Sequence, residues 1–292
     1  MTRSWFLHAG LERLFSPISI NPQRLQGEKT KPLECCIAIT IALVTGALVT
    51  SVSDAADLDR MAVIRMLETT IPQRPANLVG EDLSDIDLSN IDFRGANLAR
   101  ANLFASKLVQ ADFSGSDLTM ANLNGTWVMG TNFKGAKLSG STMLSLVSLG
   151  GAIKTRPNFV GADLSGVRMI ADLDNTDFSG ARLVKADLGV HIKNQGMGQM
   201  RTDLSNSKFV EADLAGADLN RSVLSFANFR GANLSGAVLY RANLSGADLT
   251  GANVAGADFT EVNLDRTILK DVKGLDTVKG METTVNRDKA VF

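Results

Sequence analysis

Aspartate recurs along this chain at a fixed place in a short repeat. Carboxylates at regular spacing are the groups that carry out acid–base chemistry or bind hard cations. A catalytic pair is singular, whereas this feature is periodic, so we interpret these side chains as outward groups that hydrogen-bond the turns. The column includes Asp87, Asp92, Asp112, Asp117, Asp213, Asp218 and Asp258.

A second candidate lies in the stretch 189–202, which contains His191, Met197 and Met200. One imidazole and two thioethers are ligands that copper(I) accepts, but the set has no thiolate and no second imidazole. The glycines of GMGQMR do not form a phosphate loop, because no strand-to-helix unit surrounds them. The sequence therefore favours a plain loop and predicts no metal and no cofactor.

Other chemistry has few parts in this chain. There are only two His and two Cys, so serine- and cysteine-based catalytic systems have almost no residues to draw on, and we predict that the protein is not an enzyme. Cys35 and Cys36 open an apolar stretch and are interpreted as small apolar residues. The 30 Lys and Arg against 31 Asp and Glu leave a net charge of −1, without the basic surplus that attracts nucleic acid.

Two aromatic residues are candidates for a contact patch. Trp127 replaces the usual Asp or Asn on the outer face, and Tyr240 follows a repeat centre at Leu239. A single exposed aromatic side chain needs no special explanation, so neither residue identifies a site by itself.

The first 56 residues form a leader. Residues 1–34 carry five basic and three acidic side chains, and residues 35–52 are uncharged and largely apolar. This pattern predicts an export signal cleaved after Ala55. The alternatives are an uncleaved membrane anchor over 35–52 and, less favoured, a buried helix. The anchor places residues 54–292 outside the cytoplasm, and the cleaved signal places the mature chain in the same periplasmic or otherwise external compartment.

The dominant pattern has a period of five residues. Large apolar residues occur at every fifth position from Leu78 to Met143 and again from Leu204 to Leu269, about 28 units in two runs. A small residue lies two places before most centres, and Asp or Asn usually lies between them, as in GANLSGAVLYRANLSGADL from Gly231. A period of five fits neither a continuous helix nor a long strand, so the chain must turn after each unit.

The spacing of phenylalanine indicates how many units make one circuit. Phe93, Phe113 and Phe133 are 20 residues apart, as are Phe209 and Phe229, and 20 residues are four units. Four units per circuit predict a square coil with stacked rings, and residues 76–270 then make nine or ten coils at about 4.8 Å each.

The middle of the chain keeps the period with slips. We expect centres at Leu144, Leu149, Phe159, Leu164 and Met169, one residue out of phase, with Lys154 as an unsuitable centre. The phase returns at Leu173 and continues through Phe178, Leu183 and Leu188. One residue is added near 143 and one is missing near 170, and 189–202 is either a protruding loop or a set of degenerate faces.

These units resemble the pentapeptide-repeat family over about 76–270, with irregular stretches at 144–169 and 189–202. The resemblance implies an all-β solenoid, a right-handed quadrilateral β-helix. Its quinolone-resistance members resemble duplex DNA to gyrase because they are cytoplasmic, dimeric and acidic along their faces. Residues 76–270 hold 20 acids and 18 bases, and the leader directs the chain elsewhere, so DNA mimicry is the least favoured function.

The ends of such a column expose strand edges and apolar interior, which pair with another copy end to end unless they are capped. Residues 57–69 have near-helical apolar spacing at Leu58, Met61, Ile64 and Leu67, with Asp54 or Asp57 as the N-cap, so 57–75 is predicted to be a capping helix and linker. Residues 271–292 lose the period; we expect Leu275 and Val278 to close the last coil and METTVNRDKAVF to form a mobile tail.

The function that fits these features is a non-enzymatic, exported scaffold whose rigid column presents a polar surface to a protein partner. Loops that interrupt a rigid scaffold usually carry specificity, so the irregular middle is the expected recognition site. A membrane-anchored envelope spacer is the alternative, and a cytoplasmic DNA mimic ranks below it. Membrane contact is expected only through residues 35–52.

Overall fold

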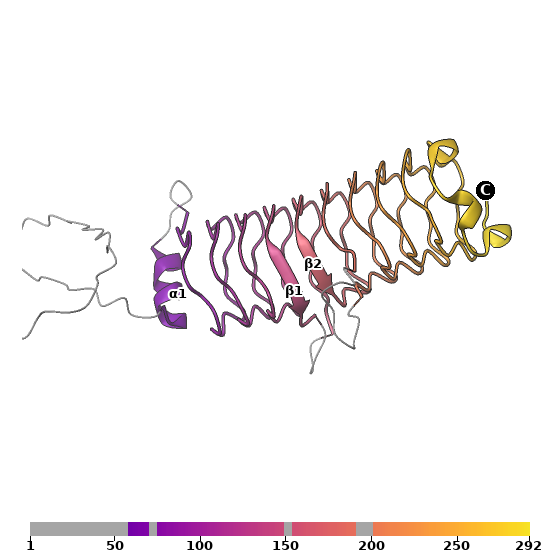
Figure 1. The fold of residues 1–292 in the computed structure, drawn as a ribbon. Helices are drawn as coiled ribbons and strands as arrows, with labels where there is room; N and C mark the ends of the chain where they lie inside the picture. Colours follow the sequence, from indigo (N-terminus) through magenta and orange to yellow (C-terminus); the bar gives the residue numbers. More distant parts are fainter. Residues whose placement is uncertain (1–57, 70–74, 149–153, 191–200) are drawn as a thin grey trace, which may run out of the picture. The chain divides into compact units, whose positions relative to one another are not determined.

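The computed structural model describes residues 58–69, 75–148, 154–190 and 201–292. The leader, with its apolar stretch 35–52, lies outside them. Most of the described chain is one stack of short-sided coils, with helix α1 (Arg60–Glu68) near residue 76 and three 3-10 helices at the other end (Figure 1). Among the described residues, no helix combines the length and the apolar character needed to cross a membrane.

Each five-residue unit makes one side and one corner of a coil. The side is a three-residue extended segment: the small residue and the apolar centre point inward and the residue between them points outward. The corner is a β-turn closed by bonds such as Ala96 N–H to Phe93 O at 3.0 Å, and its last residue is left-handed, with φ near +60°. Glycine or a polar residue occupies most of these positions, since glycine adopts that φ without steric cost.

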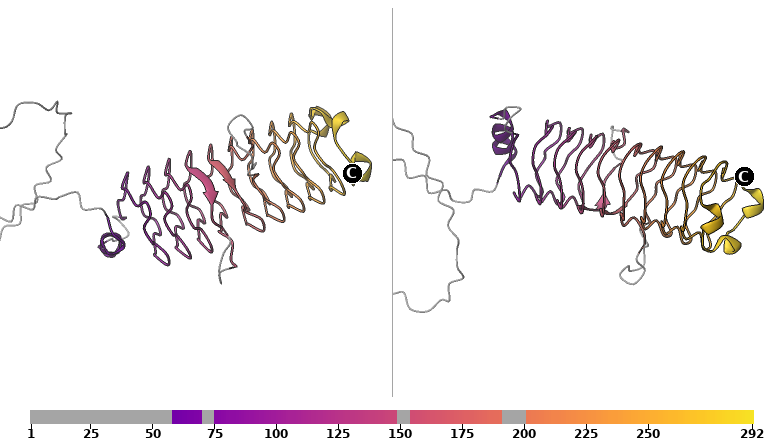
Figure 2. Two further views of the ribbon diagram at one scale, coloured as in Figure 1. Left: turned by 60° about the horizontal axis from the view of Figure 1, so that its bottom comes forward. Right: turned by 90° about the horizontal axis from the view of Figure 1, so that it is seen from above.

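Successive coils are joined by parallel ladders. The Leu98 N–H donates to Asp117 O at 2.7 Å, and the Asp117 N–H donates to Ala96 O at 2.9 Å. The outward residue of each side therefore pairs with the outward residue of the next coil, as Asn97 does with Asp117. The coils lie in one stack in every view (Figure 2).

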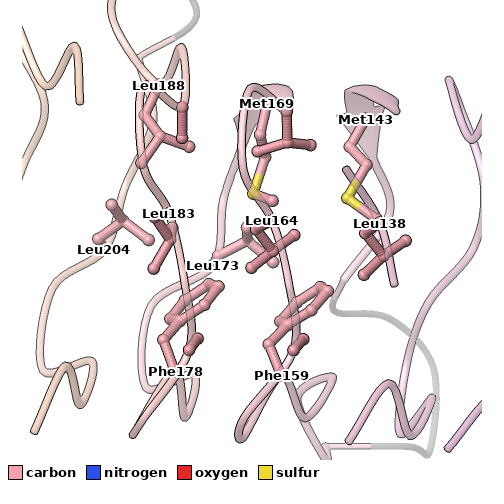
Figure 3. Close-up of a cluster of buried hydrophobic side chains, with 14 of the residues drawn as sticks. Leu138, Met143, Phe159, Leu164, Met169, Leu173, Phe178, Leu183, Leu188 and Leu204 are labelled. Carbon is pink, nitrogen blue, oxygen red and sulfur yellow. The ribbon is translucent and has the colours of Figure 1, made fainter. Parts of the chain in front are cut away.

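The core consists of four columns of fully buried centres, one behind each side of the coil. One of them is a continuous ladder of seven stacked phenylalanine rings, with centroids 4.5–5.5 Å apart. Figure 3 shows Phe159 and Phe178 in this ladder beside Leu164 and Leu183 of the next column. The predicted square coil and ring stacking are confirmed. The ladder members are Phe93, Phe113, Phe133, Phe159, Phe178, Phe209 and Phe229.

The predicted phase shift at Leu144 is wrong. Met143 is fully buried and Leu144 is only half-buried, so the original phase continues to Ser148, which is 3% exposed. The chain then takes eleven residues to reach Phe159, six more than one unit, so an insertion lies between Ser148 and Phe159. Lys154 belongs to this insertion and is exposed, and Leu149 lies outside the described residues.

The predicted deletion near 170 is confirmed. Strand β1 (Thr142–Leu146) pairs in parallel with β2 (Arg168–Ala171), and the register shifts between Leu144 and Leu146, opposite Ile170 and Ala171. The shorter unit in β2 therefore faces a bulge in β1. Both flanking centres, Met169 and Leu173, remain fully buried.

The described ends of the stretch 189–202 exclude the alternative that it adds degenerate faces to the column. The Thr202 hydroxyl donates to Leu188 O at 2.7 Å, the same bond that Ser106 makes to Leu103 O across an ordinary corner at 2.8 Å. Leu188 and Leu204 therefore occupy successive centres although 16 residues separate them. Eleven extra residues leave and re-enter the coil at one corner.

Helix α1 lies against the first coil. Asp59, not Asp54 or Asp57, is its N-cap, with Oδ1 accepting the Ala62 N–H at 2.6 Å. Val63 is fully buried in the core cluster, whereas Met61, expected to face inward, is 55% exposed.

Arg60 connects this helix to the open edge of the first coil. Its guanidinium donates to Asp87 O at 2.5 Å and to Ser89 O at 2.8 Å. These are the carbonyls that would accept N–H groups from a preceding coil. Arg60 thereby replaces the missing ladder bonds on one side of the coil.

The C-terminal residues form a further coil, so the prediction of a mobile tail over 281–292 is wrong. Its outward residues Lys273, Lys279, Val285 and Val291 pair with the preceding coil at a spacing of six. The extra residue of each unit accommodates a 3-10 helix at the corner, in η2 (Leu275–Thr277), η3 (Met281–Thr283) and η4 (Arg287–Lys289).

This last coil ends the column because the residues at its centre positions are no longer large and apolar. Gly274, Gly280 and Asn286 stand where apolar centres would lie, and all three are left-handed. Leu275, predicted to close the last coil, packs against the core together with Val278. The six-residue unit therefore ends the apolar columns instead of extending them.

Candidate interaction surface

The aspartate column performs the structural role expected of it. All seven aspartates singled out from the sequence accept the backbone N–H two residues ahead, at 2.9–3.2 Å. Asparagines at the same place also bond from coil to coil; the Asn132 amide, for example, donates to Asp112 Oδ1 at 3.0 Å. These side chains therefore order the corners.

Some of these carboxylates are held ionised by their neighbours. The side chain and backbone N–H of Ser89 lower the pKa of Asp87, and the Arg94 side chain lowers the pKa of Asp92. Both carboxylates lie on the surface, where a hydrogen-bonded anion is stable, and both shifts oppose the protonated form that a general acid needs.

One side of the column departs from this pattern, and we call it the interrupted face. Its outward residues are consecutive partners in the ladders, and three of them in a row, Lys107, Trp127 and Val147, are neither Asp nor Asn. Those three units lack the side-chain bond to the corner. The outward residues of the interrupted face are Asp87, Lys107, Trp127, Val147, Asp172, Asp203, Val223, Asn243, Asn263 and, in the C-terminal coil, Val285.

Both insertions border this face, on opposite corners. The first follows Ser148, at the corner that leads out of the face, and the second precedes Thr202, at the corner that leads into it. Between them lies the coil that carries Asp172. No other side of the column has an insertion at both of its corners.

The root of the first insertion is tied to the face by Arg156. Its side chain is only 10% exposed, and its guanidinium forms ion pairs with Asp174 and, at 3.5 Å, with Asp172. It also donates to the Ser148 hydroxyl at 2.8 Å, and that hydroxyl donates to Asp172 O. An arginine holding three groups at once fixes where the insertion rejoins the coil.

The outward aromatic side chains lie on the same face. Trp127 is 41% exposed on the face itself, and Phe104 and Tyr240 lie on the corner that leads into it. Phe226, 56% exposed and left-handed at φ 59°, lies on the corner that leads out. Every outward aromatic residue between 75 and 270 in the described chain therefore belongs to the interrupted face or its two corners.

Cationic side chains accompany two of these aromatics. Lys107 Nζ lies 5.8 Å from the Trp127 ring, and Tyr240 lies between Arg221 and Arg241, at 5.6 and 5.0 Å from its ring. Arg241 also forms an ion pair with Glu261 at 2.6 Å. Trp, Tyr and Arg are the residues that most often dominate binding energy at protein interfaces.

The geometry of the coils and a comparison with known protein families lead to the same family. The family model for pentapeptide repeats matches in eight copies, over residues 76–103, 96–135, 106–143, 200–236 and 237–273. The chain belongs to the pentapeptide-repeat family. Its coils are those of a right-handed quadrilateral β-helix, the fold of that family.

Several solved structures are similar to this pentapeptide-repeat protein. HetL from the cyanobacterium Nostoc, involved in heterocyst differentiation regulation, is 26% identical over 80% of this chain and 94% of its own, with a TM-score of 0.35. QnrB1, a plasmid-mediated fluoroquinolone resistance protein, is 18% identical over 68% and 91%, also at 0.35. A protein of the Arabidopsis thaliana thylakoid lumen is 33% identical over 36% and 66%, at 0.23. No curated protein matches the chain.

The sequence found part of this surface. Trp127 and Tyr240 were singled out, and the structure places both on the interrupted face or its corner. Phe104, Phe226 and Arg156 were missed. Phe104 and Phe226 carry a sequence signal, because they stand one and two residues after a centre in a repeat that usually places polar residues or glycine there.

The copper hypothesis falls outside what the structure describes, since His191, Met197 and Met200 all belong to residues 191–200. In the described ranges, no group of three or more His, Cys, Asp or Glu side chains is placed to hold a metal ion.

Proposed function

We propose that this protein is an exported, non-enzymatic scaffold that binds a protein partner through the interrupted face. The observation that carries the proposal is the coincidence on one side of the column of both insertions and every outward aromatic residue that the structure describes between 75 and 270. On the other three faces most outward residues are Asp or Asn, and no three consecutive coils lack both before the C-terminal coil, so those faces offer less to distinguish one protein partner from another.

The composition of the face supports a protein partner rather than nucleic acid. Phosphate binding needs a row of unpaired cations, and here Arg156, Arg241 and Lys107 have carboxylate partners. Aromatic side chains beside Lys and Arg are the composition of an interface centre. Pentapeptide-repeat proteins are generally non-enzymatic structural proteins, in line with this role.

The test is site-specific photo-crosslinking in the native cells. A photoreactive residue replaces Val147 on the interrupted face or, as the matched control, Lys137 in the same coil on the opposite face. We expect a protein adduct from position 147 and at least tenfold less from 137. Equal adducts from both positions, or none from either, would refute the proposal.

The export half of the proposal is tested separately, by cell fractionation with intact mass and N-terminal sequencing. We expect a soluble external protein that begins at Ala56. A full-length chain in the membrane fraction would favour the anchored spacer instead. A full-length chain in the cytoplasm would contradict export and revive the DNA mimic.

A further inference from the structure

We propose that the interrupted face takes a second copy of this chain as its partner, with the two columns antiparallel. This inference rests on the proposed function, because it assigns an occupant to the same face. It comes from the order of the outward residues along the face. Residues that lie equally many coils before and after Asp172 are suited to contact each other.

The symmetry operation is simple. A two-fold axis in the contact plane, perpendicular to the column and passing through Asp172, brings each position against the position equally many coils away on the other side. Trp127 lies two coils before Asp172 and Val223 lies two coils after it. The exposed indole of one copy therefore meets Val223 of the second copy, and the reverse contact forms as well.

The same axis pairs the side chains at the corners. Phe104 and Tyr240 occupy the same corner position, three coils before and three coils after the Asp172 coil, so the two rings face each other across the contact. On the other corner, Phe226 faces the corner at Met129 and Gly130, where the Met129 side chain is only 5% exposed. Trp127, Phe104 and Tyr240 thus each receive an apolar or aromatic counterpart, and each of these contacts forms twice by symmetry.

The charges select the antiparallel arrangement over the parallel one. In the antiparallel pair, Lys107 faces Asn243 and Asp203 faces Val147, so neither charge meets a like charge. In a parallel pair, each outward residue meets itself, and Lys107, Asp203 and Asp87 would all oppose identical charges. Like charges that face each other across an interface repel, so parallel pairing is disfavoured.

Only Asp172 meets itself in the antiparallel pair, and it brings its own counter-ion. Arg156 Nη2 lies 3.5 Å from Asp172 Oδ1 in each copy, so two guanidinium groups accompany the two carboxylates at the axis. The insertion roots do not meet each other, because the corner after Ser148 faces Ser205 and the corner before Thr202 faces Leu144.

The size of the contact predicts a weak, reversible dimer. The nine outward positions from Asp87 to Asn263, at about 4.8 Å each, make a strip roughly 40 Å tall, and three extended residues make it about 10 Å wide. Two such strips bury roughly 800 Å², and the corner aromatics add to that, which places the contact at the low end of specific interfaces. Dimer formation should therefore depend on concentration.

Disulfide trapping tests the arrangement. In the full-length chain with Cys35→Ala and Cys36→Ala, the pair V147C and D203C occupies positions one coil either side of Asp172, which face each other across the axis. The two sites are two coils apart within one copy, about 10 Å, too far for an internal disulfide. The matched control is K137C and R182C, at the same heights on the opposite face.

We expect mild oxidation to convert the V147C and D203C chain to a covalent dimer at least tenfold more than the control. Adding Trp127→Glu should lower that yield at least fivefold. Dimer from V147C alone at the same yield would establish parallel pairing and overturn the proposal. Yields no higher than the control would also overturn it, yet a Val147 photo-adduct with a different protein would leave the proposed function standing.

Discussion

From Phe133 to Phe159 the chain runs 26 residues, and from Phe209 to Phe229 it runs 20, yet the rings of the two pairs stack at 5.0 and 4.8 Å. Phe178 and Phe209, 31 residues apart across the second insertion, also stack at 5.0 Å. Interrupted and regular coils therefore stack their phenylalanine rings in the same way inside the column. They differ outside it, where both insertions and the aromatics gather on one face.

The difference shows how a repeat fold separates stability from recognition. Inward positions are constrained by the coils above and below, because each centre packs on its counterparts. A corner is constrained only at the two residues where the chain leaves and re-enters the coil. An insertion there costs loop entropy that grows slowly with length and leaves the columns untouched.

The largest expected loss of stability comes from removing a core side chain in one of the interrupted coils. Phe159 is fully buried and stacks on Phe133 and Phe178 at 5.0 Å each. Phe159→Ala should lower the free energy of unfolding by about 3–5 kcal/mol, from lost burial and the cavity left behind. Denaturant titration followed by circular dichroism measures the loss.

The matched control for Phe159 is Phe104→Ala on the interrupted face. Phe104 is 48% exposed, so its removal should change stability by less than about 0.5 kcal/mol. Similar losses for the two variants would mean that the interrupted coils are not packed like the rest.

The next effect compares the C-terminal coil with the pentapeptide coils. A Cβ on Gly274 would lie 2.6 Å from the Ala255 backbone at φ +73°, whereas one on Gly251, at φ +70°, meets nothing within 4 Å. Gly274→Ala should cost about 2–4 kcal/mol from overpacking plus left-handed strain, and Gly251→Ala about 1 kcal/mol from strain alone.

Thermal unfolding of both glycine variants gives the measurement. A cost for Gly274→Ala no larger than that of Gly251→Ala would show that the last coil does not pack closely on the one before it.

Most of the fold could be predicted from the sequence because a five-residue pattern recurs in some 28 units. Every unit places a small residue and an apolar centre at the same two inward positions. The phase near Leu144 could not, since Met143 and Leu144 are both apolar and only the corner geometry decides between them. The last coil was missed for a related reason. Its centres are glycine or asparagine, so a search for apolar centres reads the six-residue units as a tail.

The candidate surface was predictable only in part. A residue's side of the column follows from counting units, but the count fails at an insertion until the number of extra residues is known. The neighbours of Arg156 therefore could not be predicted by counting units, and only the folded structure shows its contacts with Asp172 and Asp174.

A smaller effect concerns acid. Hydrogen bonds and ion pairs lower the pKa of Asp87 and Asp92 in the folded state, so both carboxylates stabilise the column above the unfolded value of about 3.9. That contribution is lost as the pH falls through the folded pKa values. Unfolding free energies should decline below about pH 4, and Asp92→Asn, which keeps the corner bond, should decline less steeply. Parallel declines would remove Asp92 from the explanation.

The smallest effect on stability is expected from deleting the second insertion, although this deletion removes more residues than any other change proposed here. Deleting residues 190–200 joins Gly189 to Arg201 and restores a five-residue spacing between Leu188 and Leu204. Thr202 already bonds Leu188 O as across an ordinary corner, so the shortened chain closes the same coil and its unfolding free energy should change by about 1 kcal/mol or less. Crosslinking from position 147 measures recognition in the same variant. Lost adducts with unchanged stability would place recognition in the insertion, whereas unfolding would show that the insertion supports the column.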